Sequence, residues 1–138
     1  MKTLAMVSLL GCALASRAEV FTGENVNGPF TIHGRLRHYM GYAQMRIWVV
    51  GSTRILGVEG ETPATKKIAA LFPDHGRFDY AVYGDFTVEP LAADRKGHKR
   101  PVRILAVRNV VVERDADKAI VLLLTELAEP DGIRRGGK

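Results

Sequence analysis

The sequence predicts a mainly β domain with one short helix, arranged as a small OB-like five-stranded barrel. Apolar and polar residues alternate over 30–39, 44–51 and 77–90, which is typical of half-buried strands. Gly34 and Gly84 interrupt the apolar faces of two of these strands, where a missing side chain lets a strand bend. The one helical segment falls between the third and fourth strands, where it would close one end of a barrel. A split α+β sandwich is the alternative arrangement.

The first two strands form a hairpin near the start of the domain. Residues 30–39 have an apolar inner face and a polar outer face, and residues 44–51 repeat the pattern after a short turn at 40–43. Strands joined by so short a turn pair antiparallel. Residues 52–58 form a third strand, or extend the second past a bulge near Gly51. The inner face then consists of Phe30, Ile32 and Leu36 on the first strand and Met45, Ile47 and Val49 on the second.

A short helix is predicted over residues 64–72. Thr62 is a favourable N-cap residue, and Pro63 suits the first turn, where its missing N–H would have had no helical partner. The helix would bury one stripe of apolar residues, namely Ile68, Leu71 and Phe72.

Two long segments of the second half also have strand patterns. Residues 77–90 alternate, and residues 102–113, reached through a charged loop at 91–99, are dense in β-branched residues. Residues 115–128 are ambiguous, because their acidic start favours a helix while residues 120–124 are equally typical of a buried strand; we favour the helix. The predicted inner side of the 77–90 strand consists of Phe78, Tyr80, Val82, Phe86 and Val88.

The N-terminal residues 1–18 have the layout of a secretory signal peptide. Lys2 precedes the apolar run Leu4–Leu10, and small residues follow it, so cleavage after Ala15 or Ala18 would release a soluble protein. We therefore expect an extracytoplasmic protein, periplasmic or secreted, with no transmembrane segment in the mature chain.

Two alternatives to soluble release remain open. The run Leu9-Leu10-Gly11-Cys12 looks like a lipobox, which would give a lipoprotein anchored through Cys12. The apolar start could also belong to a cytoplasmic protein.

After the signal segment, the sequence predicts a flexible leader at 19–29, a single β-rich domain at 30–128 and a disordered tail at 129–138.

Composition limits the class of protein. The 138 residues suffice for one domain, and 46% hydrophobic with 25% charged residues is ordinary for a soluble globular protein. Cys12 is the only cysteine, so no disulfide within the chain is possible. The net charge of +5 favours anionic partners only modestly, because it serves solubility equally well.

The candidate ligand-binding residues lie on the outer face of the first hairpin. Cationic and aromatic side chains would interleave there on neighbouring strands, and on an OB-like barrel such a face stacks rings while arginines hold anionic groups. Ordinary surface arginines and a tryptophan packed under a loop would give the same pattern. The set consists of Arg35, Arg37, Tyr39, Arg46 and Trp48, with Tyr42 in the turn as an extension of either interpretation.

No motif of catalysis or metal binding is recognisable. The four histidines have no metal-ligand spacing, and the serines lie in no nucleophile motif. We therefore predict no enzyme, no cofactor and no metal, although a hydrolase that uses His33 or His75 with an outer carboxylate is a remaining interpretation.

Four segments, 30–36, 45–58, 83–88 and 107–112, form a recognisable combination, and its most specific part is the "RIW…R-LGV" segment from Arg46 to Val58. Together, over roughly residues 30–113, they resemble a family of small, uncharacterised exported proteins of proteobacteria. The resemblance implies a small exported β-rich domain and transfers no catalytic role.

The expected function is that of a non-enzymatic binding or envelope-associated accessory module. Its partner would be an anionic or glycan-like ligand or an envelope protein. The alternative is a cytoplasmic OB-like protein that binds single-stranded nucleic acid, since nucleic acid would be a routine partner only without export.

Overall fold

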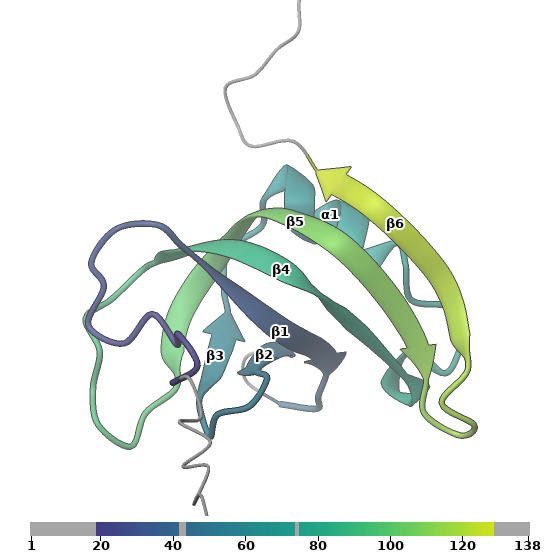
Figure 1. Ribbon diagram of the computed structural model, residues 1–138, viewed down its shortest axis with the longest axis horizontal. Helices are drawn as coiled ribbons and strands as arrows, with labels where there is room; N and C mark the ends of the chain where they lie inside the picture. Colours follow the sequence, from purple (N-terminus) through teal and green to yellow (C-terminus); the bar gives the residue numbers. More distant parts are fainter. Residues whose placement is uncertain (1–18, 42–43, 74, 129–138) are drawn as a thin grey trace, which may run out of the picture.

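A computed structural model describes residues 19–41, 44–73 and 75–128 of the chain (Figure 1). Six β-strands dominate it, with one α-helix and one 3₁₀-helix between the third and fourth strands. The elements are β1 (Phe30–His38), β2 (Met45–Val49), β3 (Ile55–Val58), α1 (Pro63–Ala69), η1 (Arg77–Asp79), β4 (Tyr80–Pro90), β5 (Arg100–Arg114) and β6 (Ile120–Ala128). The prediction of a mainly β chain with one short α-helix is confirmed.

The strands form one sheet in the order β3-β2-β1-β4-β5-β6, and all neighbours in that order are antiparallel. A parallel pairing of β3 with β5, at Leu56 to Val58, joins the sheet back onto itself. Five strands thus form a hydrogen-bonded ring, and β6 lies outside it, paired with β5 alone among the described strands. The predicted antiparallel hairpin is confirmed as β1 and β2.

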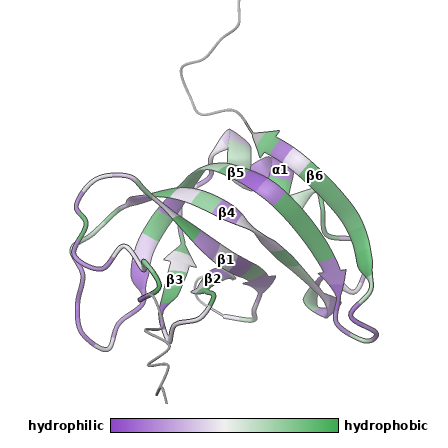
Figure 2. Ribbon diagram, viewed as in Figure 1, coloured by the Kyte–Doolittle hydropathy of each residue, from purple (hydrophilic) through white to green (hydrophobic). Residues whose placement is uncertain are grey.

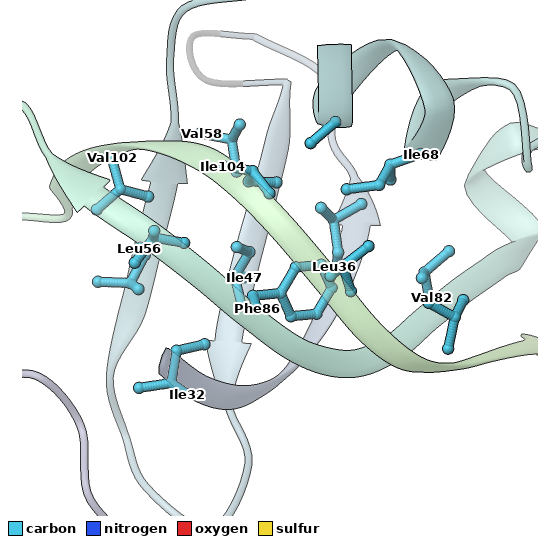
Figure 3. Close-up of a cluster of buried hydrophobic side chains, with 14 of the residues drawn as sticks. Ile32, Leu36, Ile47, Leu56, Val58, Ile68, Val82, Phe86, Val102 and Ile104 are labelled. Atoms are coloured by element: carbon cyan, nitrogen blue, oxygen red, sulfur yellow. The ribbon is translucent and has the colours of Figure 1, made fainter. Parts of the chain in front are cut away.

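The core fills the inside of this ring (Figure 3). Leu36, Ile47 and Phe86 come from β1, β2 and β4 and are fully buried side by side. The alternation in the sequence assigns these inner faces correctly. It is wrong for Phe78, because the 3₁₀-helix η1 interrupts the strand pattern there and leaves that ring 43% exposed.

The two glycines on the inner faces are direct cross-strand partners. Gly34 of β1 pairs with Gly84 of β4. A β-carbon on Gly34 would overlap Cγ2 of Ile47, and one on Gly84 would lie 2.8 Å from Cγ2 of Val107. The pairing of β4 with β5 shifts register beside Gly84, and the missing side chain there leaves room for Val107 of β5 to pack closely.

The helix α1 is attached to the ring through its N-cap. The hydroxyl of Thr62 accepts a bond from the backbone N–H of Thr65 at 3.1 Å and donates to the carbonyl of Ile104 in β5 at 2.6 Å. The predicted cap and the buried Ile68 are confirmed, while the helix ends at Ala69 rather than at residue 72. The cap therefore fixes both the start of the helix and its position on β5.

The helix favoured for residues 115–128 is wrong. Residues 115–117 form a turn, and β6 follows as an edge strand along β5. Its apolar residues Ile120, Val121, Leu122 and Leu123 remain 37–66% exposed, and the strand is among the most hydrophobic in Figure 2. A continuous apolar run fits helix and strand equally, and only the pairing with β5 decides between them.

The leader at 19–29 lies against the domain. The ring of Phe21 contacts Phe30 edge-to-face at 6.2 Å, and Val26 packs against the core. The signal segment 1–18 with Cys12, Tyr42 of the first turn and the tail 129–138 lie outside the described residues. Within the described ranges, no helix is long and apolar enough to cross a membrane.

Candidate functional site

The outer face of the sheet carries one continuous row of side chains across all six strands. Strand registers place each member opposite the next, so the row runs across β3, β2, β1, β4, β5 and β6 in turn. Its centre is a cation between two aromatic rings, and its ends are aliphatic. In spatial order the row consists of Ile55, Trp48, Arg35, Tyr83, Val111 and Leu123.

Arg35 and Trp48 form the centre of this row. The guanidinium carbon of Arg35 lies 4.7 Å from the centre of the indole ring, within the range of a cation–π interaction. The indole N–H donates to the carbonyl of Ser52 at 2.7 Å, which fixes the ring. Nε of Arg35 is buried without a hydrogen-bond partner, and no carboxylate among the described residues pairs with this arginine. Trp48 thus fixes the position of the Arg35 guanidinium, and no carboxylate among the described residues balances its charge.

Of the other three predicted site residues, two contact each other and the third pairs with a carboxylate outside the set. The guanidinium of Arg46 lies 4.6 Å from the ring centre of Tyr39, a second cation–π contact on the same hairpin. Arg37 instead forms an ion pair with Asp115, which follows β5. The structure therefore brings four of the five predicted residues together in two stacked pairs, while a carboxylate neutralises Arg37.

A polar cluster beside the row contains His33, which the hydrolase interpretation named, and the outer carboxylate of Asp85. Nδ1 of His33 is 3.0 Å from Oδ1 of Asp85, and the side-chain amide of Asn109 donates to Oδ2 at 2.8 Å. Asn109 has a left-handed backbone, φ 52°, at the irregularity of β5, and this turns its side chain toward β4. The bond from Asn109 lowers the pKa of Asp85 more than burial raises it, and contact with His33 lowers it further. Asp85 therefore remains an acceptor at neutral pH.

His38 lies on the other side of the hairpin end and has a structural role. Its ring meets Phe72 edge-to-face at 4.3 Å, and burial together with the positive charge of Arg77 lowers its pKa. The neutral imidazole is thus favoured. Within the described ranges, no three His, Cys, Asp or Glu residues converge on a point where they could hold a metal ion.

The geometry favours recognition of anions over stacking of flat rings. Guanidinium groups already occupy a face of Trp48 and of Tyr39. A guanidinium that lies over an aromatic ring still has N–H groups that can donate to carboxylate, sulfate or phosphate oxygens.

Comparison with protein-family models, with curated proteins and with solved structures finds no match to this chain. The resemblance stated from the sequence stays a prediction.

Sequence reasoning missed Tyr83, Asp85 and Asn109 as neighbours of the site, and it named His33 only for the hydrolase interpretation. The alternation over residues 77–90 leaves Tyr83 and Asp85 on the outer side of that strand, and this was the one sign in the sequence that they could face a ligand. It could not show that β4 pairs with β1 and brings them beside Arg35 and His33.

Proposed function

We propose that the protein is an exported, non-enzymatic binding module, associated with the cell envelope, that holds an acidic polysaccharide on its outer face. We further propose that the five-stranded ring is an OB-like barrel with β6 added to it. The order β1-β2-β3-β5-β4 around the ring, with α1 between β3 and β4, supports this assignment.

The observation that carries the binding function is the Arg35–Trp48 pair. The indole fixes the guanidinium at 4.7 Å, and no carboxylate among the described residues neutralises it. A pre-ordered cation loses less side-chain freedom when it binds an anion than a free arginine does. Tyr83, the cross-strand neighbour of Arg35 on β4, is half-buried, and the C–H groups of a sugar ring can pack on such an aromatic surface.

Binding of heparin, used as a probe polysaccharide, should change the fluorescence of Trp48, which is the only tryptophan of the chain. We expect a saturable change at low salt that weakens as salt is raised, and no change with neutral dextran. Single-stranded DNA of equal charge should bind more weakly. Tighter binding of DNA than of heparin would contradict the proposal and favour the nucleic-acid-binding alternative.

A matched pair of variants distinguishes binding at the Arg35–Trp48 pair from binding that depends only on the net charge of the protein. Arg35→Gln should weaken heparin binding about tenfold, the effect of losing one charge-assisted hydrogen bond. Arg103→Gln removes the same charge from β5, where Glu89 already pairs with the arginine at 2.6 Å, and should change affinity little. Equal losses in both variants would mean that net charge alone drives binding.

Export is tested by N-terminal sequencing of the protein from the cell-envelope fraction. A mature start at Ser16 or Glu19 would support cleavage of the signal segment. An intact Met1 would contradict export, and a blocked, lipid-modified Cys12 would identify the lipoprotein form.

A further inference from the structure

An open cleft of about 850 Å³ lies between three segments that are distant in the sequence. Its walls are the leader at 22–25, the β2–β3 turn at 52–55 and the β4–β5 loop at 94–99. In Figure 1 the leader and the β4–β5 loop curve together beside the left edge of the sheet. No residue of this cleft was a candidate in the sequence.

The base of the cleft is held by an internal charge cluster around Asp94. Its carboxylate accepts two bonds from Arg54, at 2.9 and 2.8 Å, and one from the backbone N–H of Asn25 at 2.9 Å. Arg100, whose side chain is only 1% exposed, lies 3.6 Å from the same carboxylate. Arg100 also donates to the carbonyl of Ala92 at 2.9 Å and to that of Gly23 at 3.4 Å. These bonds join all three walls.

The rim of the cleft carries exposed positive charge, whereas the charges at its base are paired with one another. Arg95, Lys96 and Lys99 are exposed, and no carboxylate among the described residues pairs with them. Glu24 and the neutral polar residues Thr53 and Asn25 also line the cleft. Hydroxyl groups of a sugar can use such a mixture of donors and acceptors, while its acidic groups meet the cations.

The cleft is continuous with the Arg35–Trp48 pair. The indole of Trp48 donates to the carbonyl of Ser52, and Ser52 lines the cleft. Ile55, another lining residue, is the cross-strand neighbour of Trp48.

We propose that the cleft is a second subsite for the same ligand, an acidic polysaccharide chain that extends from Arg35 and Trp48 into the space beneath Lys96 and Lys99. This inference rests on the proposed function, and it adds that the ligand is a chain of several sugars rather than a single acidic unit.

The test compares short and long heparin oligosaccharides, with Trp48 fluorescence as the readout. The wild-type protein should bind an octasaccharide about three- to tenfold more tightly than a disaccharide, because two exposed ion pairs are added. Lys96→Gln with Lys99→Gln should remove most of this length dependence and leave disaccharide binding unchanged. The matched control is Lys66→Gln with Lys67→Gln, which removes the same charge from the exposed side of α1 and should preserve the dependence.

Each outcome has one interpretation. An affinity that is independent of oligosaccharide length, or a length dependence that survives loss of both rim lysines undiminished, would overturn the second subsite while the proposed function stands. No fluorescence change with any oligosaccharide would overturn the proposed function itself. Loss of length dependence in the α1 control as well would show a general charge effect, and this would also overturn the subsite.

Discussion

Replacing Asp94 with alanine should lower the free energy of unfolding by about 3–5 kcal/mol, the usual result of removing one partner of a buried ion pair. Asp94 is the one carboxylate within reach of Arg54 and Arg100 among the described residues. The side chain of Arg100 is 1% exposed, so loss of Asp94 leaves a buried guanidinium without its negative partner. Denaturant unfolding followed by circular dichroism measures the loss.

Two further variants isolate the cause. Asp94→Asn keeps the size and one acceptor oxygen but removes the charge, so its loss should be intermediate. Glu89→Ala removes the carboxylate of the exposed pair with Arg103 and should cost no more than about 1 kcal/mol. If Asp94→Ala were as mild as Glu89→Ala, the cluster would not hold the three walls of the cleft together.

The contribution of Asp94 should also depend on pH. Burial alone would raise the pKa of this carboxyl, but the bonds from Arg54 and Asn25 and the charges of Arg54 and Arg100 outweigh burial and lower it. Because folding lowers the pKa, the stabilisation is fully present above the ordinary carboxyl value of 3.8 and is lost as the pH falls through the folded-state value. The difference in stability between wild type and Asp94→Asn should therefore shrink in acid.

The sequence predicted the parts of the fold that local alternation encodes. The inner residues of β1, β2 and β4 repeat every second position, so Leu36, Ile47 and Phe86 could be assigned before their strands were paired. Thr62 could be assigned as a cap because its partner Thr65 lies three positions away. These features need no information from distant segments.

The features that the sequence could not predict depend on distant partners. Asp94 bonds to Arg54, 40 positions away, and to Asn25, 69 positions away, so its loop resembled any charged surface loop. Arg37 alternated outward as expected, but its carboxylate lies 78 positions along the chain. For the same reason the sequence showed the basic hairpin and missed the cleft, whose walls come from three separate segments.

Phe86→Ala should lower the free energy of unfolding by about 3–5 kcal/mol, because it removes a large ring from the centre of a closely packed core and leaves a cavity. Phe86 is fully buried between strands of the ring and lies beside Leu36 and Ile47 (Figure 3). Thermal or denaturant unfolding measures the change, and Phe86→Leu, which retains most of the volume, should lose much less.

Phe78→Ala is the informative control, because alternation in the sequence assigned both phenylalanines to the same inner face. In the structure, η1 leaves Phe78 43% exposed, with the guanidinium of Arg77 5.1 Å from its ring centre. Its replacement should therefore cost no more than about 1 kcal/mol, the value of an exposed cation–π contact. Equal losses of stability at the two positions would mean that Phe78 is as buried as Phe86. The strand would then continue through residues 77–79 in place of η1.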